Sequence, residues 1–558
     1  MAIILGVSVT SVSPRAAAPD PLVFAPVVVL GPDVGGEPSI QDDSRGHVYV
    51  TSPTGLASAA VNDSGVLTVN SATGGGALWR STDGGKTFVN PGAPIFFGTQ
   101  NGGGDTDVTA DQTGVLYTAD LEAAAADVQV SKDYGATFSN ALIGQSGPDD
   151  DREWLTPVGN KLFLTYHDFS LNVDLIYVST DGGVTFTPTG LGGKIIDPTD
   201  NPTAAADCFN GNLISKPVTD REGALYILIN CSTAPANVTP TGAPLNRLYI
   251  AISRDGGASF KTTLASDVGN AGTNGGTWGH VFNQLGIDDG GDLFIVASGN
   301  LHGTDPVQTF LIRSLDNGTT WRAPINLNAD TPNNASVFPA VATGQAGEVG
   351  AGYYRVVGCQ QGSLTCKQND YRSDGTIFQF FIAQSLNARQ AVPDFTTTQV
   401  TTTSPHQNGI CTDGLFCGLP GLSAGGNRNL ADFESMTVDP SGHIELVIPA
   451  DPLNILTTDF HPTVNWYFKQ TGGALMVPGT TNGNGTGNQT YPIGALVTPT
   501  ATPVTAASAN PQILPPTSTA GSPRVVFAGV GLAAVFAGAV AVIVEGTRRR
   551  RRRQGRET

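Results

Sequence analysis

One octapeptide pattern occurs five times in this sequence and restricts the folds that the chain can adopt. The copies are STDGGKTF at 81–88, SKDYGATF at 131–138, STDGGVTF at 179–186, SRDGGASF at 253–260 and SLDNGTTW at 314–321. Their first serines are 50, 48, 74 and 61 residues apart, and a four-stranded propeller blade repeats every ~40–50 residues. We therefore expect a repeat architecture with insertions in the two longer intervals.

Short apolar runs between the copies predict strands. HVYVTS, KLFLTYHD and DLFIVAS are rich in β-branched or aromatic residues and are bounded by Gly, Asp or Asn. No stretch of this body carries a long apolar period of 3.6 residues. The fold class is therefore predicted to be all-β.

Each repeat unit begins with a predicted inner strand. The openings are EPSIQDD at 37, DVTADQTG at 107, EWLTPVGN at 153, NLISKPVTDREG at 212, FNQLGIDDGG at 282, FPAVATGQAG at 338 and FESMTVDPSG at 433. Seven openings predict a seven-bladed β-propeller over residues 19–470, with six blades as the alternative. The sixth unit has only a decayed octapeptide, QSLNARQ at 384–390. The apolar run at 22–30 is expected to supply the outer strand of the last blade, which would close the ring.

The octapeptide has the chemistry of a tight turn. An aspartate can accept hydrogen bonds from backbone amides of the turn, glycine supplies a residue with positive φ, and Ser and Thr hydroxyls bond neighbouring backbone groups. The final aromatic residue re-enters a strand. We therefore predict structural roles for the five aspartates, which are Asp83, Asp133, Asp181, Asp255 and Asp316.

This pattern resembles the Asp boxes, or BNR repeats, of the sialidase-type β-propeller superfamily. The resemblance covers about residues 30–470. It implies that each box lies in the turn between the third and fourth strands of a blade, on the rim opposite the active face. The boxes thus point to architecture, and any chemistry is expected on the other face.

The ends of the chain predict export and anchoring. Residues 1–18 resemble a signal peptide that lacks a basic start, and 471–523 form a Thr/Pro/Gly-rich segment expected to be a disordered stalk. Residues 524–546 contain an uninterrupted apolar run long enough for one transmembrane helix, and the basic tail at 547–558 is expected to remain in the cytoplasm. LPPTS at 514–518 resembles a degenerate LPxTG-type sorting signal, so cell-wall attachment is the alternative.

Charge and cysteine content agree with an extracellular body. The chain has 29 basic and 47 acidic residues, a net charge of −18, and this acidity argues against a nucleic-acid partner. Six cysteines form three local pairs by spacing, Cys208 with Cys231, Cys359 with Cys366 and Cys411 with Cys417. We expect disulfides, although other pairings are possible on paper.

Polar residues that precede the inner strands or follow the second strands predict a site at one mouth of the channel. The candidate catalytic residues are Asp107, Arg152, Glu153 and Glu434, and the candidate binding residues are Glu37, His167, Asp168, His280, Arg355, Arg428 and Asp432. The resemblance implies an arginine triad for an anionic sugar, for which Arg152, Arg355 and Arg428 are the candidates. Glu37 stands where the family places its first arginine, and this charge reversal disfavours sialic acid.

Three functions remain open from the sequence. The favoured one is a cell-surface module that recognises an extracellular glycan or glycoprotein. The first alternative is a glycoside hydrolase that uses channel carboxylates, and the second is a structural surface protein without a small-molecule ligand. We expect a monomer without a cofactor, although PDDDRE at 148–153 could bind Ca²⁺ through oxygen ligands.

Overall fold

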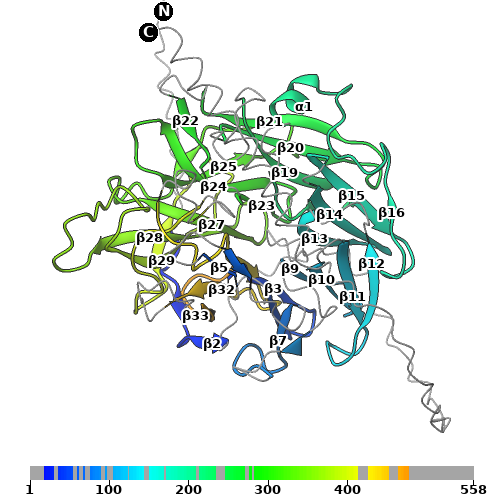
Figure 1. The fold of residues 1–558 in the computed structure, drawn as a ribbon, viewed down its shortest axis with the longest axis horizontal. Coiled ribbons are helices and arrows are strands. Elements are labelled where there is room, and N and C mark those ends of the chain that lie inside the picture. The colour runs from blue at the N-terminus through cyan, green and yellow to red at the C-terminus, as the bar shows by residue number, and fades with distance from the viewer. Residues whose placement is uncertain are drawn as a thin grey trace, which may run out of the picture. The chain divides into compact units, whose positions relative to one another are not determined.

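The computed structural model describes most of the chain between residues 18 and 476 (Figure 1). The described residues are 18–30, 36–53, 59–61, 67–69, 76–89, 95–96, 105–122, 125–143, 150–168, 171–208, 213–233, 245–269, 275–279, 282–412, 417, 425–451 and 463–476. The predicted signal peptide up to residue 17, the stalk beyond residue 476, the membrane helix, the basic tail and His280 lie outside them. No helix among the described residues is long and apolar enough to cross a membrane.

Seven antiparallel sheets of four or five strands form the blades of a propeller, as the seven openings predict. From the inner strand outward, blade 1 contains β3 (Ser39–Asp42), β4 (Val48–Ser52), β7 (Ala77–Ser81) and β8 (Ile95–Phe96), and blade 2 contains β9 (Thr106–Ala110), β10 (Leu116–Glu122), β11 (Ala125–Ser131) and β12 (Ser139–Ile143). Blade 3 contains β13 (Asp150–Val158), β14 (Lys161–Asp168), β15 (Val173–Ser179) and β16 (Thr187–Pro188), and blade 4 contains β17 (Leu213–Ile214) with β18 (Val218–Thr219), β19 (Leu225–Cys231), β20 (Arg247–Ser253) and β21 (Lys261–Asp267).

The remaining blades follow the same order. Blade 5 contains β22 (Gly275–Thr277) with β23 (Gln284–Ile287), β24 (Leu293–His302), β25 (Gln308–Ser314) and β26 (Ile325–Asn326), and blade 6 contains β27 (Ser336–Thr343), β28 (Val349–Cys359), β29 (Thr376–Ser385) and β30 (Thr396–Gln399). Blade 7 contains β31 (Ser435–Val438), β32 (Ile444–Ala450) and β33 (Val464–Gly472). A separate hairpin of β5 (Ala59–Val61) and β6 (Leu67–Val69) lies between β4 and β7 in the chain, and the helix α1 (Pro202–Cys208) precedes blade 4.

The N-terminal strands complete the last blade. β1 (Val23–Phe24) and β2 (Val28–Leu30) both pair antiparallel with β33, with Val23 opposite Gly472 and Val29 opposite Trp466. The predicted closure of the ring by residues 22–30 is therefore confirmed. Backbone groups of β33 that would otherwise form an exposed edge are paired with the start of the chain.

The core is divided among the joints between blades. Separate clusters of buried apolar side chains occupy the successive joints; the joint between blades 7 and 1, for example, contains Ile40, Trp79, Val447 and Tyr467. Each sheet thus buries both faces against its neighbours. This explains why the strands are nearly continuous apolar runs instead of alternating ones.

The five octapeptides form the predicted turns between third and fourth strands. Asp83 Oδ1 accepts hydrogen bonds from Ser81 Oγ at 2.7 Å, Lys86 N at 3.0 Å and Thr87 N at 2.9 Å, and Oδ2 accepts one from Thr87 Oγ1 at 2.6 Å. Slight burial acts in the opposite direction, but these bonds lower the pKa of Asp83 to about 2. Equivalent bonds surround Asp133, Asp181, Asp255 and Asp316.

The glycine at the fifth position of each box packs against the preceding blade. At Gly183 φ is +86°, and a Cβ atom there would lie 2.8 Å from Val130 Cγ2 on β11. The corresponding approaches are Gly85 to Tyr467, Gly135 to Leu78, Gly257 to Phe163 and Gly318 to Ile252. The box is therefore both a turn and an inter-blade contact.

A second aspartate turn, which we did not predict, recurs between the first and second strands. Asp43 Oδ1 accepts hydrogen bonds from Arg45 N at 2.9 Å and His47 N at 3.0 Å. Asp111, Asp220, Asp288 and Asp439 make the same pair of bonds in their blades. Because strands alternate in direction, these turns and the boxes lie on one face, here called the box face. The opposite face, where inner strands begin, is the mouth face.

Blade 6 stabilises its decayed box differently. Asn387 replaces the aspartate and accepts a hydrogen bond from Ser385 Oγ at 3.1 Å. Arg313 from β25 donates to the backbone carbonyls of Ala388, Gln390 and Ala391, the last two at 2.7 and 3.1 Å. A buried guanidinium of blade 5 thus holds the turn of blade 6 through three backbone carbonyls.

All three predicted disulfides form, between Cys208 and Cys231, Cys359 and Cys366, and Cys411 and Cys417. Cys231 ends β19 and Cys359 ends β28, both second strands, and Cys411 follows the outer strand β30. Each bridge therefore constrains a connection at the mouth face, whereas hydrogen-bonded turns order the box face.

Candidate functional site

The inner strands of blades 1, 2, 3 and 7 bring five charged side chains together at the channel mouth. This mouth cluster consists of Glu37, Asp105, Arg152, Arg428 and Asp432. Arg152 Nη1 lies 2.9 Å from Glu37 Oε2, Nη2 lies 3.2 Å from Asp432 Oδ2, and Nε lies 3.6 Å from Asp105 Oδ2. Arg428 Nη2 contacts Asp432 Oδ2 at 2.5 Å and Glu37 Oε1 at 3.3 Å.

Aromatic rings complete the surroundings of Arg152. Its guanidinium carbon lies 3.9 Å from the ring centre of Phe282 in blade 5 and 4.7 Å from that of Phe433 in blade 7. One side chain from blade 3 therefore contacts four other blades. Such cation–π and ion-pair contacts across the channel occupy its mouth with protein atoms.

Burial raises the pKa values of the carboxyl groups in the mouth cluster, whereas the neighbouring arginines lower them. Burial raises the pKa of Glu37 well above its ordinary value despite the attraction of Arg152, and it raises the pKa of Asp105 to about 6. At Asp432 burial is outweighed by Arg428 and Arg152, which lower its pKa to about 2. Asp432 is thus the carboxylate that most firmly keeps its negative charge beside the two arginines.

The backbone at the mouth is locally strained. Glu37 has φ of +46° and Arg152 has φ of +64°, a left-handed conformation that is uncommon for residues with a Cβ atom. In β13 the pairing with β14 shifts between Asp151 and Trp154, which marks a bulge at Arg152. The bulge directs Arg152 toward the channel instead of continuing the regular alternation of the strand.

A second ion pair crosses the channel further from the mouth face than the first. Lys216 Nζ of blade 4 lies 2.8 Å from Asp107 Oδ1 of blade 2 and donates to the carbonyl of Val108 at 2.9 Å. Asp107 also accepts hydrogen bonds from Ser39 Oγ and Leu155 N, each at 2.8 Å. Burial raises the pKa of Asp107 and lowers that of Lys216, and the attraction between the two opposite charges acts against both shifts.

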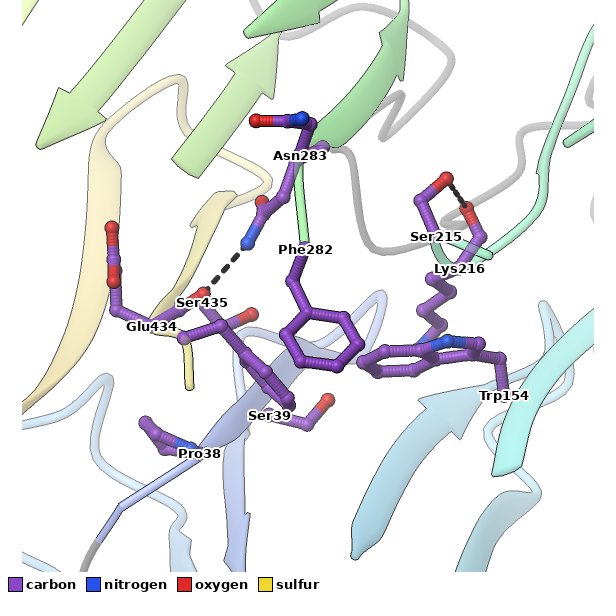
Figure 2. A pocket seen from close by; sticks show the side chains of 11 residues that line it. Pro38, Ser39, Trp154, Ser215, Lys216, Phe282, Asn283, Glu434 and Ser435 are labelled. Atoms are coloured by element: carbon purple, nitrogen blue, oxygen red, sulfur yellow. Dashed lines mark hydrogen bonds between the residues drawn. The ribbon is translucent and has the colours of Figure 1, made fainter. Parts of the chain in front are cut away.

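A small pocket lies beside these ion pairs. Figure 2 shows the Trp154 and Phe282 rings next to each other, with Lys216 on the Trp154 side and Glu434 on the other. The pocket leaves about 20 Å³ for the centres of water molecules, which is room for about one or two waters. Its remaining lining includes Pro38, Ser39, Ser215, Asn283, Gln284, Phe433 and Ser435.

Glu434 is the least satisfied carboxyl group of the site. Its side chain is fully buried, and no other described residue donates a hydrogen bond to its carboxyl oxygens, although its own backbone N–H lies near them. Burial raises its pKa well above the ordinary value. The raised pKa favours the protonated form of this carboxyl group, which can donate a proton.

Other predicted site residues have separate environments. His167 Nδ1 lies 3.0 Å from Asp174 Oδ1, and Asp168 accepts a hydrogen bond from Leu171 N at 2.8 Å within the β14–β15 connection. Arg355 pairs with Asp330 at 3.0 Å, whereas Arg152 and Arg428 share Glu37 and Asp432. Glu153 is buried next to Arg152 in sequence.

Sequence reasoning missed Lys216, Trp154, Phe282 and Phe433. A signal was present, because an aromatic residue stands near the start of the openings of blades 3, 5, 6 and 7. For metals, the described part of the chain contains no group of three or more His, Cys, Asp or Glu residues that could hold an ion. Ca²⁺ binding at 148–153 stays a prediction.

No family model and no curated protein matches this sequence. Among solved structures, YCF48 bound to D1 peptide is 11% identical with a TM-score of 0.38, covering 69% of this chain and 87% of that chain. An alpha-L-arabinanase of Penicillium chrysogenum complexed with arabinobiose is 13% identical with a TM-score of 0.38, covering 81% and 98%. A mutant of the NanB sialidase from Streptococcus pneumoniae is 12% identical with a TM-score of 0.36, covering 82% and 71%. The seven-bladed architecture therefore rests on the strand pairing of this protein itself.

Proposed function

We propose that this protein is a cell-surface recognition module that binds a neutral extracellular glycan at the mouth face without cleaving it. The observation that carries the proposal is the commitment of the channel carboxylates to internal ion pairs. Glu37 and Asp432 hold Arg152, and Asp107 holds Lys216. A glycoside hydrolase needs two carboxyl groups on either side of the scissile bond, and these groups face protein cations.

The lining of the pocket supports a sugar as ligand. Aromatic rings such as Trp154 and Phe282 offer apolar faces, and the carboxyl, amide and hydroxyl groups around them offer hydrogen bonds. With space for one or two waters, the pocket would accept one hydroxyl or hydroxymethyl group, and the mouth loops would contact the rest. Glu37 and Asp432 occupy the guanidinium groups of the two arginines in the mouth cluster, so these arginines are not free to bind the carboxylate of sialic acid, and neutral glycans are favoured.

The location outside the cell belongs to the same proposal. Three disulfides are typical of proteins in oxidising compartments. The apolar run at 525–544 and the arginines at 548–553 support a single-pass anchor with the propeller outside; wall attachment is the alternative. Protease treatment of intact cells tests this, because an external propeller is digested while an epitope on the basic tail is protected.

The burial and raised pKa of Glu434 favour a second candidate function, that of a glycoside hydrolase. A buried carboxyl group with a raised pKa beside a pocket is suited to act as a general acid. Hydrolysis would use Glu434 as proton donor, and the loss of that donor would reduce turnover by roughly 10²–10⁴-fold. A protein with neither binding nor turnover would be the structural surface protein.

The deciding experiment combines a glycan array with a panel of fluorogenic glycosides, both probed with the full-length protein in detergent. The proposal expects retention on neutral glycans, weak retention on sialylated ones and no turnover. Glu434→Gln is the test variant, and Glu222→Gln, an exposed residue on the box face, is the matched control. Turnover that disappears in Glu434→Gln and persists in Glu222→Gln would refute the non-catalytic function and establish the hydrolase.

A further inference from the structure

The joint between blades 7 and 1 ends in charged residues at the box face. Along β3 the apolar Ile40 is followed on the same side by Asp42, and along β33 Tyr467 is followed by Lys469. Glu445 on β32 pairs in register with Lys469. The closing cluster is the group of charged residues Asp42, Asp439, Glu445 and Lys469, of which Asp439 lies in the β31–β32 turn.

The closing cluster contains more carboxyl groups than cations. Lys469 Nζ lies 2.9 Å from Asp439 Oδ2 and also pairs with Glu445 Oε1. Asp42 is 1% exposed, and neither of its carboxyl oxygens has a hydrogen-bond partner among the described residues. One ammonium therefore serves three buried or half-buried carboxyl groups at the joint where the first and last blades meet.

Neighbouring titratable groups do not correct this imbalance. From blade 1, Asp43 bonds His47 at 2.8 Å and accepts a hydrogen bond from the Tyr49 hydroxyl at 3.3 Å. From blade 7, His443 lies 3.3 Å from Asp439. The Tyr467 hydroxyl lies under Gly85 of the first box and faces Glu445 and Asp42, to which it offers a hydrogen-bond donor but no positive charge. Both histidines are thus engaged with other aspartates and not with Asp42 or Glu445.

At the other four boxes the glycine at the fifth position meets an apolar side chain of the preceding blade. Gly135, Gly183 and Gly318 meet Leu78, Val130 and Ile252 of the preceding blade, whereas Gly85 meets the hydroxyl of Tyr467. The joint that closes the ring therefore differs in chemistry from these three. It also contains side chains from both ends of the folded body, Leu30 of β2 and Tyr467 of β33, whose strands pair with each other within blade 7.

We propose that the closing cluster is a pH-dependent lock, in which protonated Asp42 and Glu445 keep blades 7 and 1 together and loss of their protons weakens this joint. Protonation removes two negative charges from a buried site that has a single ammonium. Deprotonation leaves carboxylates without enough partners, and separation of the blades then allows water to solvate them.

The direction of the pH dependence follows from the two states of the joint. In the closed joint, burial raises the pKa of Glu445 to about 7 and that of Asp42 well above its ordinary value. In an open joint both groups would return to values of about 4. The closed joint thus binds protons more tightly, and its opening constant rises between about pH 4 and 7, by up to about tenfold per pH unit for each group.

Hydrogen exchange of the full-length protein between pH 5 and 8 tests the lock. The reporters are the amides of β2 and β33, and those of the β14–β15 hairpin in blade 3 are the internal reference, all corrected for the intrinsic pH dependence of exchange. We expect the opening constant of the β2–β33 pairing to rise at least tenfold from pH 5 to 7 while the reference rises less. Equal rises in both places would overturn the proposal, even if no variant can be purified.

Two isosteric variants make the test specific. Asp42→Asn and Glu445→Gln imitate the protonated groups, so each is expected to lower the opening constant at pH 7 and to reduce its pH dependence by up to about tenfold per unit. Glu222→Gln, which removes an exposed carboxylate of blade 4, should change neither. A pH dependence that is unchanged in both Asp42→Asn and Glu445→Gln would overturn the proposal.

Discussion

The two adjacent glycines of the third box allow a direct test of the inter-blade contact. Gly182 and Gly183 have φ of +77° and +86°, so an alanine at either position carries the cost of a left-handed conformation, about 1–2 kcal/mol. Only Gly183 contacts the preceding blade. Its Cβ would lie 2.8 Å from Val130 Cγ2, and the Cβ of Gly182 would meet no atom within 4 Å.

The added methyl group at Gly183 overpacks the joint between blades 2 and 3. Overpacking in a filled core costs about 1–3 kcal/mol, so Gly183→Ala should lose about 2–5 kcal/mol in total and Gly182→Ala about 1–2 kcal/mol. For a domain of several hundred residues, an unfolding entropy of about 2 cal/mol/K per residue converts each kcal/mol into roughly 1 °C of Tm. We therefore expect Gly183→Ala to lower Tm by about 1–3 °C more than Gly182→Ala.

Differential scanning calorimetry of the two variants measures this difference. Equal decreases in Tm would refute the reasoning, because the contact with Val130 would then contribute nothing. Unchanged Tm in both variants would refute the requirement for positive φ as well. A smaller companion change, Val130→Ala in the Gly183→Ala background, should recover part of the loss, since it removes the methyl group nearest to the new Cβ.

Three further predictions concern named interactions. Arg152→Met should lower the free energy of unfolding at pH 7 by about 3–5 kcal/mol, because the three buried carboxyl groups of the mouth cluster then have Arg428 as the one cation left in that cluster; urea unfolding should show a smaller loss at pH 5, where Asp105, with a pKa of about 6, takes up a proton, and a loss independent of pH would contradict this account. Asp83→Ala should cost about 1 kcal/mol, as the loss of a helix-capping aspartate does, without changing glycan binding. Because the pKa of Asp83 is lowered to about 2, its stabilisation is present above its unfolded value of about 4 and should vanish in thermal scans as the pH falls toward 2; a difference that persists there would be inconsistent with the hydrogen bonds to its carboxylate. Arg313→Ala should cost about 3 kcal/mol, roughly 1 kcal/mol for each carbonyl that loses its donor, and unaltered amide exchange in the β29–β30 turn would argue against this role.

Much of the fold was predictable because its signals are local. The bonds of each box join residues two to four positions apart, such as Ser81, Asp83 and Thr87. Such turns form from neighbouring residues wherever the pattern occurs, and their spacing indicated the blades. The closure by residues 22–30 followed from an apolar run with no blade of its own.

The location of the candidate site could be predicted from the sequence, but the ion pairing of its residues could not. The residues before the inner strands were expected to meet at one mouth, and Glu37, Arg152, Arg428 and Asp432 do meet there. Their mutual pairing could not be read from the sequence, because Arg152 and Asp432 are 280 residues apart. The aspartate turns between first and second strands were missed although the D-x-x-G pattern was visible.

The sequence by itself determined the repeated turn, and it favoured seven blades over six, local pairs of cysteines and, through the resemblance of the boxes, the face on which a site would lie. Only the tertiary structure decided that the channel carboxylates are paired with Arg152 and Lys216, that no other described residue donates to the buried Glu434 carboxyl group, and that the closing joint is charged. The physical reason is the range of the interactions. Turns depend on a few adjacent residues, whereas burial, ion pairing and pKa depend on which distant strands the closed ring brings into contact.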